Sequence, residues 1–234
     1  MRGTISHLYE RAMVVEQAAT SQQYGHRAWE PAMHGGLLVG LLLVPIFVKT
    51  LASWPLYLLA PLLAYGLIVC CLGPLRRTVS WLRMGRHDGP VILVTLAVIV
   101  LSSSVLLVYS VLFPVESPEL VAPILGWLPS ELLLAGVLFA VLNGLLEEII
   151  FRGILLDALR AEVGLPVALL VQSVGFGVGH AHGYPPGAIG IILASIYGMV
   201  LGLLRLYARG MVAPIVAHIA ADATIFAIVM KQFP

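Results

Sequence analysis

The stretch Leu145-Leu146-Glu147-Glu148-Ile149-Ile150-Phe151-Arg152-Gly153 carries three charged side chains inside a segment that is otherwise apolar enough to cross a membrane. A charged residue near the centre of a membrane-spanning helix costs about 2.5–3.5 kcal/mol on insertion scales. Three such residues in close succession are therefore expected only where a functional role offsets this cost. Because ionisable groups inside a membrane mark functional sites by default, this stretch predicts a functional site within a membrane-spanning helix.

The composition of the whole chain indicates an integral membrane protein. Of the 234 residues, 60% are hydrophobic and only 11% are charged, and the mean hydropathy is +0.99, whereas a soluble domain carries about 25% charged residues. The net charge of +1, without a dense basic run, argues against nucleic acid as a partner. The adjacent cysteines Cys70 and Cys71 suggest neither a disulfide framework nor a metal-binding pair.

Seven segments are apolar enough to form membrane-spanning helices, since a span needs about 20 mostly apolar residues. We predict these helices near residues 33–51, 54–75, 91–113, 131–151, 165–182, 187–205 and 211–230. The expected fold class is therefore all-α, a polytopic transmembrane helix bundle of about seven spans, within a range of about six to eight. Residues 1–30 are polar and are predicted to form a cytoplasmic segment ahead of a single transmembrane domain at 31–234.

The distribution of basic residues predicts the orientation of this bundle. If the N-terminus is cytoplasmic, only Lys49 and Lys231 fall outside, and the connection at 114–130, which contains Glu116 and Glu119, forms an external loop. The arginines then all lie on the cytoplasmic side, at positions 2, 11, 27, 76, 77, 83, 86, 152, 160, 205 and 209. The preference for arginine over lysine favours a prokaryotic plasma membrane as the location.

Three of the predicted helices carry polar residues that a purely structural bundle would avoid. Residues four positions apart share one face of a helix, and three pairs follow this spacing: Glu148 with Arg152, Phe176 with His180, and His218 with Asp222. Each pair also has a structural interpretation. The first could be an ion pair only, Phe176 could be a packing residue, and the members of the last pair could simply orient each other.

Helix arithmetic predicts that these polar groups lie at a similar depth. If the helix of Glu148 continues to about residue 161 and the chain reverses near Gly164, Glu148 and His180 each lie about 24 Å from the turn, at a rise of 1.5 Å per residue. This depth corresponds to about 10 Å below the membrane surface, and His218 lies about 12 Å past the turn near Gly210. We therefore expect one polar cavity shared by three helices.

Such a cavity has the groups needed for hydrolysis. A glutamate can take a proton from water as a general base, and histidines can polarise a carbonyl oxygen or join a carboxylate in a zinc site. The chain contains neither an HExxH motif nor a serine in a nucleophile elbow. Two accounts stay open: one divalent metal ion, zinc, held by Glu147, His180 and His218, or a metal-free glutamate and histidine mechanism.

Three motifs occur in a fixed order on separate predicted helices: EExxxR at Glu147, Glu148 and Arg152, FxxxH at Phe176 and His180, and HxxxD at His218 and Asp222. In this order they resemble the motifs of the CPBP family, which comprises the CAAX proteases and the bacteriocin-processing enzymes, also called Abi proteins. The resemblance covers about residues 131–230, which would form the catalytic core.

The resemblance implies an intramembrane endopeptidase that hydrolyses membrane-associated, prenylated or bacteriocin-type peptides. Glu147 would activate the water and His180 would be its catalytic partner. His218 and Asp222 would stabilise the oxyanion or bind a metal, whereas Glu148 and Arg152 would be the supporting pair. The implied partners are a peptide or protein substrate, with or without a lipid modification, and the bilayer itself.

Two other functions are compatible with the same residues. A proton-coupled transporter would use the glutamates and histidines as a proton relay, although inverted repeats, which would favour that function, are absent from the sequence. A non-catalytic membrane scaffold or immunity protein would keep the motif residues for structure alone.

Overall fold

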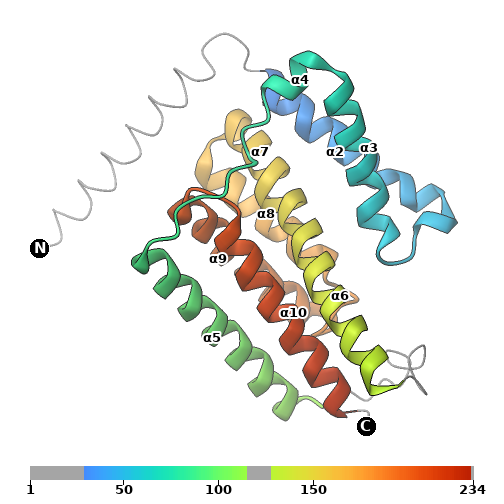
Figure 1. Cartoon of the computed structure of the whole chain (residues 1–234), viewed down its shortest axis with the longest axis vertical. Coiled ribbons are helices and arrows are strands. Elements are labelled where there is room, and N and C mark those ends of the chain that lie inside the picture. Colours follow the sequence, from blue (N-terminus) through green and yellow to red (C-terminus); the bar gives the residue numbers. More distant parts are fainter. Residues whose placement is uncertain (1–28, 115–127, 233–234) are drawn as a thin grey trace, which may run out of the picture.

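The computed structural model describes residues 29–114 and 128–232, which form helices and connecting turns without a strand among them (Figure 1). In chain order the elements are α2 (Trp29–Phe47), the 3-10 turn η1 (Lys49–Leu51), α3 (Leu56–Cys71), α4 (Gly73–Arg77), α5 (Gly89–Leu112), α6 (Pro129–Glu148), the π-helical segment η4 (Ile149–Leu155), α7 (Leu156–Val163), α8 (Leu165–Gly179), α9 (Gly187–Ala208) and α10 (Val212–Gln232). The all-α fold class is confirmed.

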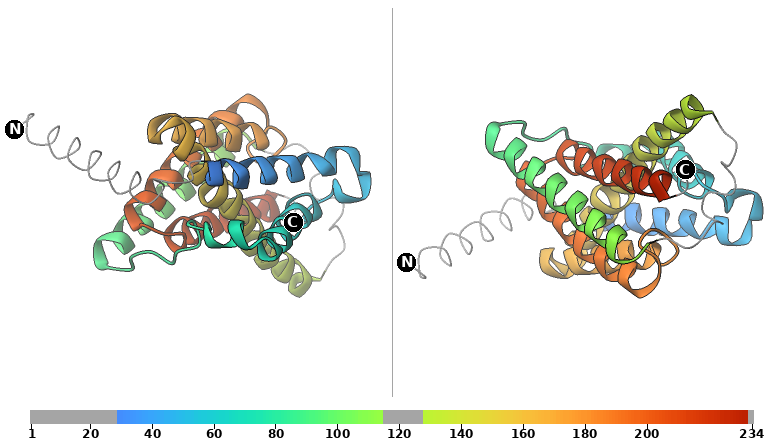
Figure 2. Two further views of the ribbon diagram at one scale, coloured as in Figure 1. Left: turned by 90° about the horizontal axis from the view of Figure 1, so that it is seen from above. Right: turned by 90° about the horizontal axis from the view of Figure 1, so that it is seen from below.

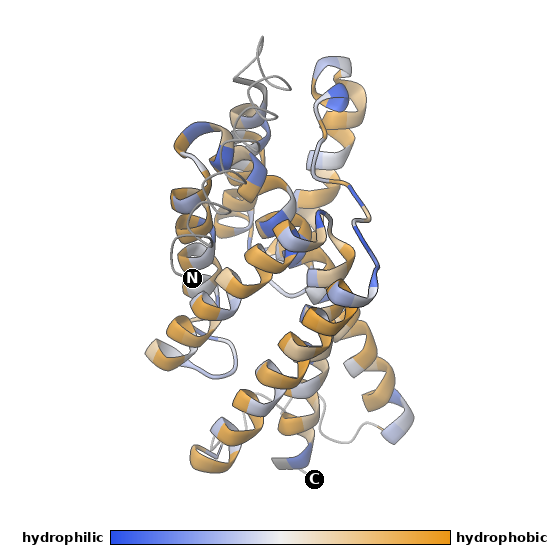
Figure 3. Cartoon of the chain, turned by 90° about the vertical axis from the view of Figure 1, so that its left-hand side faces the viewer, coloured by the Kyte–Doolittle hydropathy of each residue, from blue (hydrophilic) through white to orange (hydrophobic). Residues whose placement is uncertain are grey.

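Each of the seven predicted spans corresponds to an apolar helix. Four helices are long and apolar enough to cross a membrane, at Gly89–Leu112, Pro129–Val163, Gly187–Ala208 and Val212–Lys231, and three apolar helices are shorter, at Pro31–Phe47, Leu56–Cys71 and Leu165–Gly179. Large apolar side chains remain exposed on the outer faces; Val111 of α5, for example, is 79% exposed, and apolar residues cover most of the ribbon in Figure 3. The protein is therefore an integral membrane helix bundle.

The helix that carries the two glutamates is longer than one membrane crossing. From Pro129 to Val163 the chain forms 35 helical residues, so the predicted continuation beyond Arg152 is confirmed. Gly164 then reverses the chain with a φ of 77°, a value that favours glycine. A π-helical segment, Ile149–Leu155, interrupts the α-helix directly after Glu148. Such segments occur often at functional sites, and the sequence did not predict this one.

Two close helix approaches hold the centre of the bundle together. A Cβ atom at Gly144 of α6 would lie 3.1 Å from the backbone nitrogen of Ile219 in α10. A Cβ atom at Gly177 of α8 would lie 2.4 Å from the carbonyl oxygen of Ile191 in α9, so a side chain does not fit there. These glycines therefore let α6 pack directly against α10, and α8 against α9.

Three apolar clusters surround the centre of the bundle. One lies between α2, α3 and α6–η4, the second between α5, α9 and α10, and the third between α7 and α8. Seen from above and below, α2 and α3 lie on the opposite side of the bundle from α5 (Figure 2). The buried members of the clusters are Leu38, Leu58, Tyr65, Val69, Leu75, Leu146, Ile150 and Ile154; Val91, Leu201, Leu204, Ala208, Ala213 and Ala217; and Leu156, Ala168 and Leu169.

The loop before α5 ties several basic residues to one end of the bundle. The backbone nitrogen of Arg86 donates to the carbonyl oxygen of Ala208 at 2.7 Å, and the nitrogen of Met211 donates to the carbonyl oxygen of Arg83 at 2.8 Å. Asp88 caps α5 by accepting from the nitrogen of Val91, and its hydrogen bond to the Arg86 side chain holds the pKa of Asp88 below its usual value. The side of the membrane that this end faces stays a prediction.

Arg152 does not belong to this basic end. Its side chain is fully buried within the bundle, so it should not count toward the positive charge of the cytoplasmic loops. The predicted N-terminal segment and most of the predicted external loop, with Glu116 and Glu119, lie outside the described residues.

Candidate active site

Glu148 connects two helices through a single oxygen atom. Nη1 of Arg152, four residues later in the same helix, donates to Glu148 Oε1 at 2.7 Å. Nδ1 of His218 in α10 lies 2.7 Å from the same oxygen. All three side chains are almost completely buried. Because a carboxylate oxygen can only accept, His218 Nδ1 donates here, and this bond sets the orientation of the His218 ring.

Glu147 faces both histidines. Its Oε2 lies 3.7 Å from Nε2 of His180 and 3.6 Å from Nε2 of His218, and this buried oxygen has no hydrogen-bond partner among the described residues. His180 comes from the C-cap of α8, and its Nδ1 donates to the carbonyl oxygen of Phe176 at 2.8 Å. Both Nε2 atoms are therefore acceptors when the rings are neutral.

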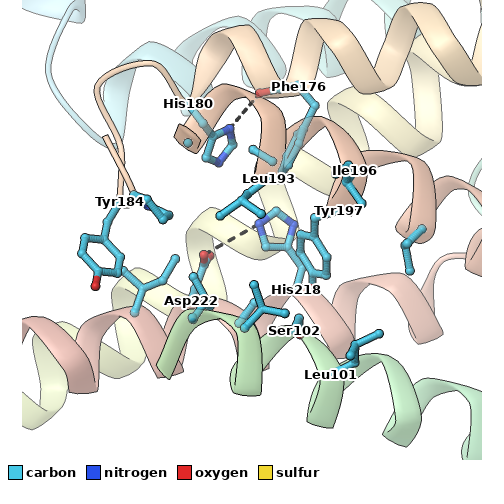
Figure 4. Close-up of a pocket in the computed structure, with 18 of the residues that line it drawn as sticks. Leu101, Ser102, Phe176, His180, Tyr184, Leu193, Ile196, Tyr197, His218 and Asp222 are labelled. Carbon is cyan, nitrogen blue, oxygen red and sulfur yellow. Dashed lines mark hydrogen bonds and ion pairs between the residues drawn. The ribbon is translucent and has the colours of Figure 1, made fainter. Parts of the chain in front are cut away.

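Three acceptor atoms thus face one another at the centre of the bundle. Such a group can hold a hydrogen-bond donor such as water, a shared proton or a cation, because each of these satisfies several lone pairs at once. Asp222 adds a further carboxylate, with Oδ1 3.7 Å from His218 Nε2, as the close-up in Figure 4 shows. The carboxylates of Glu147, Glu148 and Asp222 surround His218, so positive charge bound among them is electrostatically favoured.

Phe176 is in contact with most of the site. Its ring centroid lies 4.3 Å from that of His180 and 5.6 Å from that of His218. The guanidinium carbon of Arg152 lies 4.1 Å from the same centroid, a distance typical of a cation–π interaction. Phe176 therefore packs as the sequence suggests, but what it packs against are the charged and titratable groups of the site.

The predicted site residues are therefore brought together, whereas other contributors were not identified from the sequence. The hydroxyl of Tyr197 in α9 donates to the carbonyl oxygen of Ala217 at 2.9 Å, and the Tyr197 ring lies edge-on to His218. Asn143 contacts Asp222. Its spacing of four residues before Glu147 is the only sequence signal that relates it to the site. No motif marks Tyr197.

Two cavities meet at His180 and Phe176, which line both. The first has a volume of about 370 Å³ and is lined by Glu147 and Tyr57; the rest of its lining is mostly apolar and comes from α2, α3, η4 and α8. The second has a volume of about 190 Å³ and is bordered by His218 and Asp222. Figure 4 shows these two residues on one wall of the second cavity, below His180. The titratable cluster thus forms the boundary between the two cavities.

Glu147, His180 and His218 offer one carboxylate oxygen and two imidazole nitrogens, a combination of ligands that occurs in zinc sites. In the described ranges, however, no group of three or more histidine, cysteine, aspartate or glutamate side chains is arranged to hold a metal ion. The side chains in this arrangement do not fit a preformed metal site.

The fold and the site together define the class of protein: an integral membrane helix bundle that encloses a buried cluster of glutamate and histidine side chains. The family model of Rce1-like proteins, the type II CAAX prenyl endopeptidases, matches residues 129–224 of this chain. This range contains all three motifs, so the resemblance to the CAAX proteases is confirmed, and the family indicates a protease. Neither a curated protein nor a solved structure matches the chain.

The buried pair of Glu148 and Arg152 leads to a prediction about stability. We expect Glu148→Gln and Arg152→Met each to reduce the free energy of unfolding by about 3–5 kcal/mol, because each leaves its buried partner charge unpaired. The double variant should lose less than the sum of the two. Denaturant unfolding of the detergent-solubilised protein measures all three. Strictly additive losses would show that the ion pair is not formed.

Proposed function

We propose that this protein is an intramembrane endopeptidase that hydrolyses a peptide bond with a water molecule activated by Glu147. The observation that supports this most strongly is the buried Oε2 of Glu147, which has no hydrogen-bond partner among the described residues and faces the Nε2 atoms of His180 and His218. A general base needs an oxygen that is free to accept a proton, and Glu147 Oε2 is such an oxygen. The family match is consistent with the same reaction.

The chemistry follows from the positions of these groups. Glu147 Oε2 takes a proton from the water while the water oxygen forms a bond to the carbonyl carbon of the peptide. When protonated on Nε2, His218 can donate a hydrogen bond to the resulting oxyanion. The carbon–nitrogen bond of the peptide then breaks, and the proton held by Glu147 passes to the leaving amine. His180 Nε2 is the other group close enough to Glu147 to take part in this proton transfer.

Two neighbouring residues would support this cycle without reacting. Glu148 accepts from His218 Nδ1 at 2.7 Å and so keeps Nε2 directed toward Glu147. Arg152 neutralises Glu148, which would otherwise be a second unpaired carboxylate next to the base. Phe176 packs against the His180 ring and lies edge-on to the His218 ring, which restricts the movement of both.

The lining of the second cavity is suited to an apolar part of a substrate. Most of its lining is aliphatic, and it borders His180, His218 and Asp222. We propose that the scissile peptide lies in the cavity that contains Glu147, and that the second cavity receives an isoprenoid chain or bulky apolar side chains of the substrate. The aliphatic residues that would contact this part of the substrate are Val98, Leu101, Val105, Leu106, Leu193, Ile196, Val200 and Ile225.

Purified protein in liposomes, given internally quenched peptides that end in a CAAX sequence, tests this function. One peptide carries a farnesyl group on its cysteine and a matched peptide does not. We expect cleavage of the farnesylated peptide, faster than of the unmodified one, with the cleaved bond identified by mass spectrometry. If neither peptide is cleaved and the membrane peptidome of expressing cells is unchanged, the proposal is wrong. Proton flux in the same liposomes would then favour the transporter alternative.

The role of a metal needs its own measurement. Because the side chains do not form a preformed metal site, we expect active, purified protein to contain well under one zinc ion per chain and to keep its activity after chelation. Elemental analysis of an active preparation, before and after dialysis against a chelator, measures this. Stoichiometric zinc, activity lost on chelation and activity restored by added zinc would instead assign a metal to Glu147, His180 and His218.

A further inference from the structure

We propose that Asn143 is a positioning residue of this site, which acts by holding the carboxylate of Asp222 away from His218. The inference rests on the proposed function, because it assigns Asn143 a role in the same hydrolysis. Asn143 lies outside the three motifs, in α6 one turn before Glu147, and its side chain is 6% exposed.

The side-chain amide of Asn143 joins two groups that are far apart in the sequence. Its Nδ2 donates to Asp222 Oδ2 at 3.1 Å. Its Oδ1 accepts from Nε1 of Trp54, in the connection before α3, at 3.3 Å. Trp54 packs in turn against Phe139, with ring centroids 5.5 Å apart. Asn143 therefore links α6 both to α10 and to the segment before α3.

The two neighbours of Asn143 require the same orientation of its amide. An indole nitrogen can only donate, so only the Oδ1 of Asn143 can accept the hydrogen bond from Trp54. An ionised carboxylate can only accept, so only the Nδ2 of Asn143 can donate to Asp222. A flipped amide would place a donor against the indole and an acceptor against the carboxylate, and both hydrogen bonds would be lost. The direction in which Asn143 presents its donor is therefore determined by its surroundings.

The packing of α6 on α10 also brings Asn143 close to Asp222. At Gly144, next to Asn143, a Cβ atom would lie 3.1 Å from the backbone of Ile219, one turn from Asp222. At Gly136 a Cβ atom would lie 2.4 Å from the Phe226 ring, one turn beyond Asp222. The two helices thus approach closely on both sides of the pair. This leaves little freedom for Asn143 and Asp222 to move apart.

The distances around Asp222 indicate what this contact does. Oδ1 of Asp222 lies 3.7 Å from Nε2 of His218, which is too far for a hydrogen bond. With Oδ2 held by Asn143, Asp222 stays near His218 without engaging Nε2, and Nε2 remains available to the substrate. Without Asn143, Asp222 is free to rotate toward His218 and form that hydrogen bond, which would withdraw Nε2 from the reaction.

The test is steady-state cleavage of the farnesylated CAAX peptide by reconstituted variants. We expect Asn143→Ala to lower kcat on the order of 10- to 100-fold with little change in KM, since the substrate pocket itself is unaltered. Asn143→Asp should be at least as impaired, because two carboxylates would then face each other. Adding Asp222→Asn to Asn143→Asp restores a donor and acceptor pair, and we expect it to recover most of kcat.

Ser103→Ala is the matched control. Ser103 of α5 also makes a hydrogen bond between helices to α10, to Thr224 at 3.0 Å, but it does not line either cavity. It should lose a similar amount of thermal stability while kcat is unchanged. Full kcat in Asn143→Ala, or failure of Asp222→Asn to rescue Asn143→Asp, with an active wild type, overturns this inference alone. A wild type that cleaves nothing overturns the proposed function and this role with it.

Discussion

Replacing Glu147 by glutamine is expected to abolish peptide cleavage while the protein stays folded. Glutamine keeps the shape of the side chain but lacks the basic oxygen that would accept a proton from water. Because Oε2 of Glu147 has no hydrogen-bond partner among the described residues, the substitution removes no native hydrogen bond at that atom. General-base catalysis contributes on the order of 100- to 10,000-fold, and we expect a loss in this range.

The measurement compares kcat/KM on the farnesylated CAAX peptide, together with the melting temperature in detergent. Glu162→Gln provides the control, since Glu162 is an exposed glutamate of α7 on the same long helix. It undergoes the same chemical change outside the site and should keep the wild-type rate. A Glu147→Gln protein that cleaves at the wild-type rate would exclude Glu147 as the base. An unfolded variant would show instead that Glu147 supports the fold.

The second large effect is expected at His180, and a neighbouring histidine provides its control. His180→Ala removes the Nε2 that lies 3.7 Å from Glu147 Oε2, and with it one of the two imidazoles of the site. We expect a loss of activity comparable to that of Glu147→Gln. His182, two residues later, lies exposed in the turn that follows α8 and lines neither cavity. Its replacement by alanine should have little effect.

The comparison separates a role in the reaction from a general effect on the end of α8. Both substitutions shorten a histidine side chain in the same turn, so a change in the turn itself would lower both activities. A selective loss in His180→Ala, with similar melting temperatures for the two variants, would support a role at the reacting atoms. Equal losses in the two variants would contradict it, as would normal activity in His180→Ala.

Several features of the fold follow from the order of residues along the chain. Apolar runs of about 20 residues are visible without any tertiary information, because the bilayer thickness sets their length. The pairing of Glu148 with Arg152 follows in the same way, since residues four apart meet on any α-helix. The Gly164 turn could also be located, because a helix that carries Asp157, Arg160 and Glu162 must leave the membrane.

Other features depend on contacts between helices that have no counterpart in local sequence. The hydrogen bond from His218 to Glu148 joins residues 70 positions apart, and it depends on the rotation of α10 about its own axis. The contact between Asn143 and Trp54 requires the segment before α3 to pack over α6. The π-helical segment after Glu148 shifts the residues that follow relative to a regular α-helix, and no motif marks it.

By itself, the sequence determined that this is a membrane helix bundle with titratable residues on three of its helices, because hydrophobic length and spacing along a helix are properties of the chain alone. Only the tertiary structure decided which atoms face each other. In the structure, Glu147 Oε2 faces two imidazole nitrogens. Glu148 accepts hydrogen bonds from Arg152 and His218, and Asp222 accepts one from Asn143. The reason is physical: helix rotation and closeness of approach are set by packing, here by the glycines at 144 and 177 that let neighbouring helices touch.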